Sequence, residues 1–258
     1  MSKTLIILVL LGSMILHLSS ATARAEDNTT SGPPPPGSAD DPAWGYWSKL
    51  SNPNAWLSAH QRLTRAAQAQ DAEIVFLGDS ITKGWLEQGR SQWDSHYKAM
   101  NAIDLGIGGD STRQILWRLD HGALGNHAPR IIVLMIGTNN ILNSKADSVE
   151  IIEGIKAIIT RIQQLAPGAT TLLLSPPPLG AAAKNDRVID LTQHLAELEL
   201  PNVVFLDITG AFTDDLGVVD LELYRPDRIH PNAEGYARLD EQLYPSLTRL
   251  LSKCASDK

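Results

Sequence analysis

The sequence predicts an α/β fold, a three-layer α/β/α sandwich built around a five-stranded parallel sheet. Five short apolar runs of strand length recur along the chain, and segments with the spacing of helices lie between them. The runs are apolar at nearly every position, as in parallel strands that helices cover on both faces. Because crossovers between parallel strands are right-handed, the helices are expected on both sides of the sheet.

The five predicted strands are rich in Ile, Leu and Val, and polar or turn-forming residues bound them. Branched aliphatic side chains fit a pleated, buried surface, so each run is assigned to one strand. The runs cover residues 74–77, 103–107, 131–136, 171–174 and 203–206.

The predicted helices carry apolar residues three and four positions apart, the period of a helix with one buried face. The clearest examples are residues 148–165 and 186–198. A helical stretch at 55–70 precedes the first strand, and a final helix at about 232–251 closes the fold. No internal repeat is present.

The first 25 residues have the pattern of a secretory signal peptide. Lys3 supplies a positive charge, residues 5–18 are mostly apolar, and Ala23-Arg24-Ala25 has the small-x-small form that signal peptidase accepts. The apolar run is marginal for spanning a bilayer, which needs about 20 residues, so an uncleaved membrane anchor is the alternative. We expect a secreted or periplasmic protein with no stable membrane insertion after cleavage.

Residues 26–43 are rich in Pro, Gly, Ser and acidic residues and are expected to form a flexible linker, extended at its four prolines. The folded domain is expected to span residues 44–258. Near its start, Trp44, Trp47 and Trp56 are expected to pack the N-terminal segment onto the domain, because large aromatic side chains are usually mostly buried.

The overall charge argues against some classes of partner. The formal net charge is −7, which gives no general attraction for nucleic acid or an anionic membrane. Cys254 is the one cysteine, so the chain has no internal disulfide. The expected partner is a small-molecule or glycan ester substrate, and the oligomeric state is not determined by the sequence.

Candidate functional residues follow the predicted strands, at the points where the strands end. Ser80 follows the first strand, Gly109 the second and Asn139 the third, while Asp227 and His230 lie in the long segment after the fifth. The carboxyl ends of parallel strands meet at one edge of a sheet, where open α/β sheets bind their ligands. The convergence of these residues at one edge predicts an active site.

These residue types suit nucleophilic catalysis on an ester. A serine hydroxyl needs an adjacent base to remove its proton, and His230 can act as that base near neutral pH. Asp227, three residues earlier, can hold the other ring nitrogen and stabilise the imidazolium. The Ser80 amide, the Gly109 amide and the Asn139 side chain could donate to the oxyanion that forms during attack.

Other interpretations of the same residues stay open. Gly78-Asp79-Ser80 alone could be an ordinary strand-to-helix turn with Ser80 as a cap. Asp227 and His230 could be metal ligands, although no third ligand at suggestive spacing is evident. The glycines at 106, 108 and 109 weakly resemble a dinucleotide fingerprint, but Ser111 occupies the position of its third glycine. No Gly-x-Ser-x-Gly elbow is present, which argues against the α/β-hydrolase fold.

The motifs resemble those of the SGNH (GDSL) hydrolase family. Its four blocks are matched by Gly78-Asp79-Ser80, Gly109, Gly137-Thr138-Asn139 and Asp227-x-x-His230. The chain is most similar to the branch that contains the catalytic subunits of intracellular platelet-activating-factor acetylhydrolase. That similarity covers about residues 54–250 and includes the runs at 56–60, 105–110, 116–119 and 133–140.

The resemblance implies a flavodoxin-like fold and an esterase without a metal or organic cofactor. It assigns Ser80 as nucleophile, Asp227 and His230 as the rest of the triad, and Ser80, Gly109 and Asn139 to the oxyanion hole. One departure is Asn140, where many relatives carry Asp, and it affects how that loop is held.

The predicted function is an exported serine ester hydrolase that removes short acyl groups, acetyl groups above all, through an acyl-enzyme. Deacetylation of carbohydrate or cell-envelope polysaccharide is the alternative substrate class. A non-catalytic α/β binding module is the alternative of a different kind. No long apolar insertion is present that could form a lid over long acyl chains. Trp85 and Trp117 could line an acyl pocket or pack in the core.

Overall fold

The computed structural model describes residues 52–126 and 128–256. The expected signal peptide at residues 1–25, the linker at 26–43, and Trp44 and Trp47 lie outside the described residues. Within the described ranges, no helix is long and apolar enough to cross a membrane.

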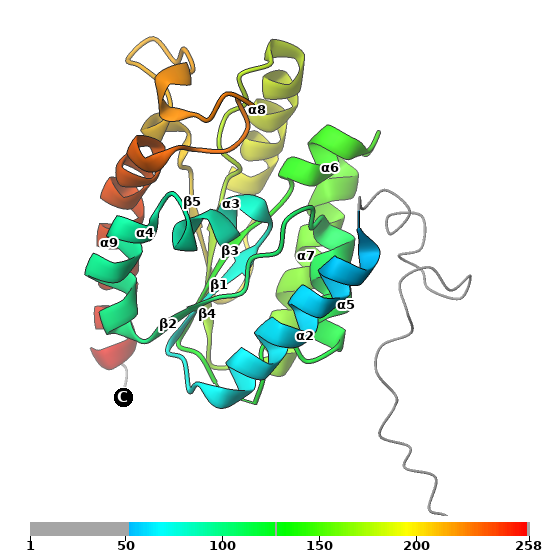
Figure 1. Cartoon of the computed structure of the whole chain (residues 1–258), viewed down its shortest axis with the longest axis vertical. Helices are drawn as coiled ribbons and strands as arrows, with labels where there is room; N and C mark the ends of the chain where they lie inside the picture. The colour runs from blue at the N-terminus through cyan, green and yellow to red at the C-terminus, as the bar shows by residue number, and fades with distance from the viewer. Residues whose placement is uncertain (1–51, 127, 257–258) are drawn as a thin grey trace, which may run out of the picture. The chain divides into compact units, whose positions relative to one another are not determined.

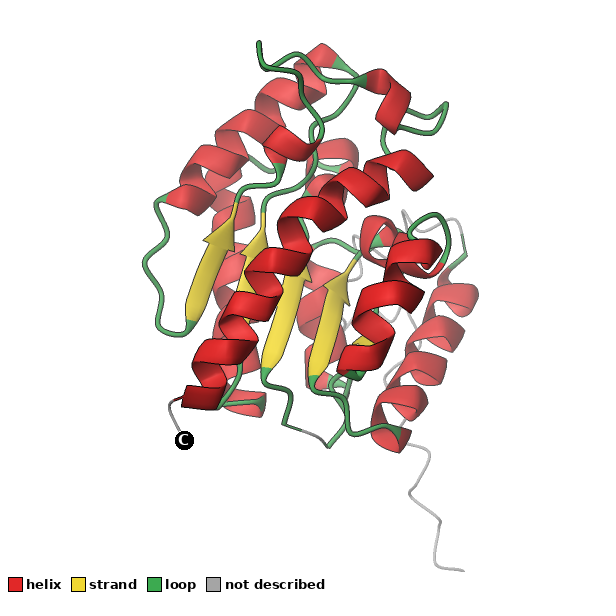
Figure 2. Ribbon diagram, turned by 90° about the vertical axis from the view of Figure 1, so that its left-hand side faces the viewer, coloured by secondary structure: helices red, strands yellow, loops and turns green. Residues whose placement is uncertain are grey.

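Five parallel strands form one sheet in the order β2-β1-β3-β4-β5, which confirms the predicted α/β fold. Figure 2 shows the strands running in the same direction through the centre of the fold, with helices in front of and behind them. The strands are β1 (Ile74–Gly78), β2 (Ala102–Asp104), β3 (Ile131–Met135), β4 (Thr170–Leu174) and β5 (Val203–Leu206).

The strand order reverses direction next to β1. The chain passes from β1 outward to β2 and then returns to the other side of β1 to form β3. The crossover connections therefore diverge above the carboxyl ends of β1 and β3, which leaves a crevice there. Ser80 follows β1 and Asn139 follows β3, so the topology brings both to that crevice.

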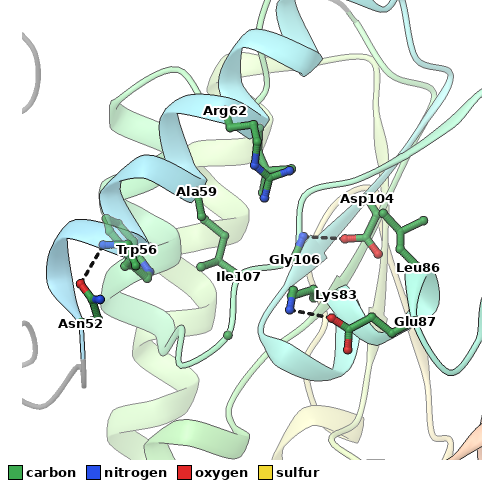
Figure 3. A pocket seen from close by; sticks show the side chains of 13 residues that line it. Asn52, Trp56, Ala59, Arg62, Lys83, Leu86, Glu87, Asp104, Gly106 and Ile107 are labelled. Carbon is green, nitrogen blue, oxygen red and sulfur yellow. Dashed lines mark hydrogen bonds and ion pairs between the residues drawn. The ribbon is translucent and has the colours of Figure 1, made fainter.

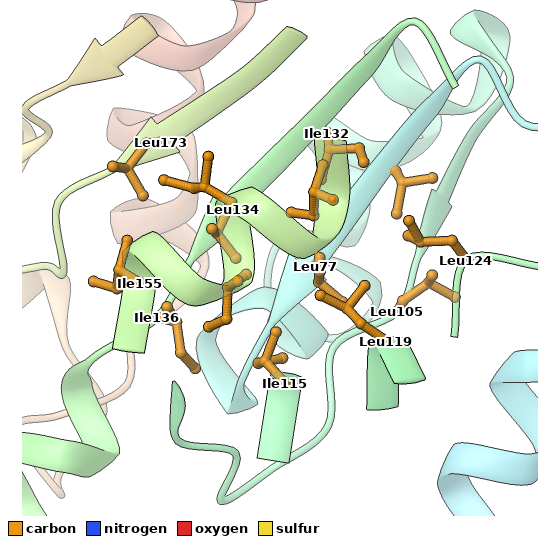
Figure 4. Close-up of a cluster of buried hydrophobic side chains, with 14 of the residues drawn as sticks. Leu77, Leu105, Ile115, Leu119, Leu124, Ile132, Leu134, Ile136, Ile155 and Leu173 are labelled. Carbon is orange, nitrogen blue, oxygen red and sulfur yellow. The ribbon is translucent and has the colours of Figure 1, made fainter. Parts of the chain in front are cut away.

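Successive strand residues face opposite layers, which explains why the runs are apolar throughout. On β1, Val75 and Leu77 join one buried cluster, whereas Ile74 and Phe76 join the other. β3 alternates in the same way. Figure 4 shows Leu77, Ile132 and Leu134 in the first cluster, packed against Ile115 and Ile155 of the covering helices.

The first layer of helices contains α2 (Pro53–Ala69), α5 (Thr112–Asp120), α7 (Ser148–Leu165) and α8 (Ala182–Ala196). Figure 1 shows α2, α5 and α7 on the side of the sheet opposite α9. In α7, Asp147 caps the first turn through the Glu150 amide, and an isoleucine stripe from Ile151 to Ile162 faces the sheet. These helices complete the larger of the two main clusters.

The second layer is built from α9 (Ala233–Ser256) and from short helical turns between residues 80 and 100. The turns are α3 (Ser80–Lys83), η2 (Gly84–Leu86), α4 (Arg90–Gln92), η3 (Trp93–Tyr97) and η4 (Lys98–Met100). Their aromatic side chains pack edge to face: Trp85 contacts Phe76, Tyr97 and Tyr236, at centroid distances of 5.0 to 6.1 Å. Trp85 is therefore a core residue.

Three predicted boundaries differ from the structure by three residues or more. β2 ends at Asp104 instead of residue 107: the amides of Leu105 and Ile107 still donate to β1 carbonyls, but the Leu105 carbonyl accepts from the Arg118 side chain. α8 begins at Ala182, four residues before the predicted start. α9 continues to Ser256, beyond the predicted end at 251.

Candidate active site

Ser80 is the first residue of α3, directly after β1 and its capping residue Asp79. The Asp79 carboxylate accepts the Ile81 amide at 2.8 Å, which fixes the turn from strand to helix. The cap is therefore Asp79, not Ser80, and the Ser80 hydroxyl is left for another contact. Ser80 is partly exposed at the carboxyl edge of the sheet.

The Ser80 hydroxyl contacts His230, which lies 150 positions later in the chain. The Ser80 Oγ lies 2.8 Å from His230 Nε2, and His230 Nδ1 lies 3.0 Å from Asp227 Oδ2. When Nδ1 carries the ring proton, His230 donates to Asp227 and its Nε2 can accept from the Ser80 hydroxyl. This arrangement can move a proton from Ser80 to His230.

A tight turn holds Asp227 against His230. The other carboxylate oxygen, Asp227 Oδ1, accepts the amides of Ile229 and His230, each at 2.9 Å. Arg228 between them has a left-handed backbone with φ of 58°, which closes the turn. Burial works to raise the pKa of Asp227, but these amides and the His230 ring outweigh it and lower the pKa to about 2. Asp227 is therefore ionised at neutral pH.

The loop after β2 brings Gly109 beside Ser80. A Cβ added at the neighbouring Gly108 would lie 3.7 Å from the Ser80 Cβ, so the two segments are in contact. Gly109 has φ of 86°, a conformation that a side chain would strain. Among the described residues, neither the Ser80 amide nor the Gly109 amide has a hydrogen-bond acceptor. Both are available donors.

Asn139 reaches the same place from α6 (Thr138–Asn143), the short helix after β3. Its Nδ2 donates to the Asp110 carbonyl at 2.9 Å and lies 3.4 Å from Asp79 Oδ2. Burial, aided by the Asp110 charge, raises the pKa of Asp79 to about 7. The five residues predicted from the sequence are thus brought together at one edge of the sheet.

The sequence of the chain matches a family of known hydrolases. The GDSL-like lipase/acylhydrolase family matches residues 76–238, more than half of the chain. The chain belongs to this family. It is accordingly a carboxylic ester hydrolase.

Individual proteins are also similar to this chain over most of its length. The platelet-activating factor acetylhydrolase IB subunit alpha2 of Rattus norvegicus is 31% identical over 215 residues, covering 81% of this chain and 90% of the relative. The alpha1 subunit of the same species is 32% identical, covering 77% and 84%.

Solved structures share the fold of this GDSL hydrolase. A GDSL-like lipase from Bacteroides thetaiotaomicron has a TM-score of 0.58 at 17% identity, covering 74% of this chain and 97% of the other. A carbohydrate esterase family 3 protein from Talaromyces cellulolyticus has a TM-score of 0.55 at 18% identity, covering 70% and 99%.

The Gly109 loop of this GDSL hydrolase is held in place by contacts that were not predicted from the sequence. Asp110 is fully buried and accepts from Arg118 at 2.6 Å and from the Trp56 indole at 2.6 Å. Burial raises the pKa of Asp110 to about 6, although Arg118 and Trp56 oppose the shift. Trp56 and Trp117 also pack together in a small buried cluster, as expected for Trp56. Trp56 thus has two roles, packing and donating to the loop.

Asn140, the departure from many GDSL relatives, is buried and pairs with the start of α5. Its Oδ1 accepts the Thr112 amide at 3.1 Å, and its Nδ2 donates to Thr112 Oγ1 at 2.9 Å. An amide side chain supplies both an acceptor and a donor, so it satisfies both partners. This pair ties the Asn139 loop to α5.

Two adjoining cavities open at the site of the GDSL hydrolase. A cavity of about 140 Å³ lies at Ser80 and His230, and a second, of about 490 Å³, lies between α2 and the loop after β2. Both are lined by Lys83, Glu87 and Gly108. In the described ranges, no group of three or more His, Cys, Asp or Glu is placed to hold a metal ion.

Proposed function

We propose that this hydrolase removes short acyl groups, acetyl groups above all, from esters through an acyl-enzyme on Ser80. The observation that carries the proposal is the continuous contact from Ser80 through His230 to Asp227, with distances of 2.8 and 3.0 Å. These are the contacts that a nucleophile, its base and the partner of the base require.

In the first half of the reaction, His230 Nε2 takes the hydroxyl proton as Ser80 Oγ attacks the ester carbonyl carbon. The carbonyl oxygen becomes negative and accepts from the Ser80 and Gly109 amides and from Asn139 Nδ2. One hydrogen of Nδ2 donates to the Asp110 carbonyl, and the other is held only by a long 3.4 Å contact with Asp79 Oδ2, which the oxyanion can replace. When the intermediate collapses, the bond to the alkoxy oxygen breaks and His230 returns the proton to the leaving alcohol.

In the second half, a water molecule attacks the acyl carbon of the ester on Ser80. His230 takes a proton from this water. The bond between the acyl carbon and Ser80 Oγ then breaks, His230 returns the proton to Oγ, and the carboxylic acid is released. Asp227 remains ionised throughout, because its pKa is lowered to about 2. Its charge stabilises the imidazolium in both halves.

The size of the cavity at Ser80 supports a short acyl group. Its volume of about 140 Å³ lies below the 300–1,000 Å³ typical of sites for larger ligands. The acetylhydrolase names of the curated relatives agree with acetyl as the preferred group. Each further methylene contributes about 0.8 kcal/mol only while the pocket still holds it.

The proposal includes export, which rests on the N-terminal sequence. Cleavage after residue 25 is supported by Lys3, the apolar residues 5–18 and Ala23-Arg24-Ala25. The proposal then places a linker over 26–43 and a catalytic domain over 44–258. N-terminal sequencing of the protein recovered from culture supernatant or periplasm should give Glu26 or a neighbouring residue. Recovered protein that still begins at Met1 would contradict cleavage after residue 25, and absence of the protein from both compartments would contradict export.

The central test replaces Ser80 and His230. Ser80→Ala and His230→Ala should each lower kcat for phenyl acetate by about 10³-fold or more, because the residues act as a unit. Circular dichroism and unchanged unfolding curves would show that the fold is kept. A fluorophosphonate probe should label the natural protein and not Ser80→Ala. An unlabelled natural protein would favour the alternative of a non-catalytic binding module.

The acyl length is tested with nitrophenyl esters from acetate to palmitate. The value of kcat/KM should fall steeply between butyrate and octanoate, because the cavity at Ser80 is small. A maximum at ten carbons or longer would exclude the short-acyl proposal and indicate a lipase.

A further inference from the structure

The larger cavity beside the active site has no role in the reaction described above. It is about 490 Å³ and lies between α2 and the segments that carry Lys83 and Gly106 (Figure 3). Lys83, Glu87 and Gly108 line this cavity and the smaller one at Ser80. A substrate bound at Ser80 can therefore extend into it.

Asp104 is the unusual residue in the wall of this cavity. It is only 5% exposed, and its Oδ1 accepts the Gly106 amide at 2.7 Å, as Figure 3 shows. Its Oδ2 has no hydrogen-bond partner among the described residues. Burial raises the pKa of Asp104 to about 7, with the Gly106 amide and Arg118 opposing the shift. A buried polar atom without a partner is costly, and a bound ligand can remove that cost.

The rest of the lining mixes apolar and polar groups. Trp56, Leu86 and Ile107 contribute apolar surface. Lys83 and Glu87 form an ion pair of 2.6 Å at the border with the smaller cavity, and Arg62 points in from α2 (Figure 3). These three charged side chains are exposed and can rearrange around a ligand.

The chemistry of this lining suits a polar alcohol half of an ester better than a long acyl half. An alkyl chain has no group to pair with Asp104, so a long acyl group would leave its Oδ2 buried and unsatisfied. A ligand with several hydroxyl groups offers donors and acceptors, and so it can pair with a carboxyl group in either protonation state. Its carbon-bound hydrogens can pack on the apolar surface.

We propose that this cavity binds the alcohol half of the ester and that Asp104 determines its specificity, selecting an alcohol with several hydroxyl groups, such as a sugar. The inference rests on the proposed function, since it requires the ester to react at Ser80. It adds a binding site and a substrate class to that reaction.

The first test fills the cavity without touching a buried polar group. Ala59 lines the cavity on α2, and Ala66 is an exposed alanine on the same helix outside it. Ala59→Phe should lower kcat/KM for a monoacetylated methyl glucoside at least 10-fold more than for phenyl acetate, through KM. Ala66→Phe, the matched control, should leave the ratio of the two unchanged. An equal loss on both esters, no loss on either, or a shift in acyl-length preference would overturn the inference.

The second test removes the acidic group but keeps its structural contact. In Asp104→Asn the side-chain oxygen can still accept the Gly106 amide, so the fold is expected to remain. Free methyl glucoside should inhibit phenyl acetate hydrolysis competitively at pH 8. Asp104→Asn should raise its inhibition constant at least fivefold there, because a carboxylate oxygen accepts a sugar hydroxyl more strongly than the amide nitrogen of Asn donates to one. Absence of inhibition, or equal inhibition of both proteins, would overturn the inference.

The failure of the two proposals can be told apart. If phenyl acetate is hydrolysed and Ser80→Ala abolishes the activity, the proposed function stands whatever the sugar ester shows. If Ser80→Ala keeps its activity, the proposed function fails, and inhibition by methyl glucoside then reports on the cavity alone.

Discussion

Asp79 and Asp227 are two carboxyl groups of the proposed active site, and their surroundings shift their pKa values in opposite directions. Two backbone amides and the His230 ring lower the pKa of Asp227 to about 2, against the effect of burial. Asp79 is almost completely buried, and its pKa is raised to about 7. Near neutral pH, Asp227 carries a full charge, whereas Asp79 is divided between its two protonation states.

The ionised state of Asp227 leads to a prediction for Asp227→Asn. The asparagine Oδ1 can still accept the Ile229 and His230 amides, so the turn should survive. Its Nδ2 would donate to His230 Nδ1 and force the ring proton onto Nε2, which then cannot accept from Ser80. We expect kcat to fall by about 10³-fold or more. The exposed Asp214 is a matched control, and a near-normal kcat in Asp227→Asn would contradict the assignment.

Asn139 is predicted to act mainly in the transition state. Asn139→Ala should lower kcat by about 10²–10³-fold with little change in KM, because the developing negative charge needs the donor more than the neutral ester does. Steady-state kinetics with phenyl acetate measures both constants. A variant with a raised KM and an unchanged kcat would show that Asn139 binds the ground state instead.

At the scale of elements, the contact between α5 and α7 supports the loops that carry the proposed oxyanion-hole residues. Gly154 of α7 lies under Thr112, the residue that Asn140 holds. A Cβ at Gly154 would lie 2.8 Å from Thr112 Cβ and Oγ1, which is closer than side chains approach. Only glycine lets the start of α5 come this close to α7.

Gly154→Ala therefore tests two opposing effects. Alanine favours a helix over glycine by about 1 kcal/mol, whereas overpacking in a buried contact costs about 1–3 kcal/mol. We expect the overlap to dominate, so that the free energy of unfolding falls and kcat falls with it as Thr112 moves Asn140 and Asn139. Urea unfolding and kinetics measure the two effects. Gly168→Ala, where a Cβ meets nothing within 4 Å, is the control. A stabilised Gly154→Ala with normal kcat would contradict this account.

At the scale of the whole molecule, buried acids make stability depend on pH. The folded pKa of Asp104 is about 7, whereas its ordinary value is 3.8. The folded state therefore binds more protons between these values, so this group's contribution to stability is present below pH 4 and lost as pH rises through 7. The buried His60, with its pKa lowered to about 4, acts in the opposite direction between pH 4 and 6.5.

Comparison with Asp104→Asn isolates the contribution of this one acid. Between pH 5 and 8, the free energy of unfolding of the natural protein should fall by about 1–3 kcal/mol relative to that of the variant. Urea unfolding at several pH values measures the difference. Parallel pH profiles of the two proteins would show that Asp104 titrates normally in the folded state.

The sheet and the residues at its edge could be predicted because their signals are local. Each strand was visible as a run of apolar residues, and Ser80, Asn139 and His230 were marked by their place after strands. The contacts that support them could not be found this way. Asp104 is one acid within an apolar run, and the pairs Trp56–Asp110 and Asn140–Thr112 join residues 54 and 28 positions apart.

The short turns between residues 80 and 100 were also not predicted as elements. None of them is long enough for the helical period to repeat, and they are held by aromatic packing on α9 and β1. A period of 3.6 residues needs several turns to be recognised.

Ser80 and His230 lie 150 positions apart, so the ribosome makes Ser80 long before it makes His230. The proposed base, His230, is made late in synthesis, and α9 after it docks through Leu239, Leu243 and the Tyr236 hydroxyl, which donates to the Ile81 carbonyl at 2.6 Å. Until that segment is in place, Ser80 has no base, and on the proposed mechanism the nascent polypeptide is inactive. A polypeptide ending before residue 208 should be inert, and adding the separate C-terminal fragment should restore hydrolysis by complementation.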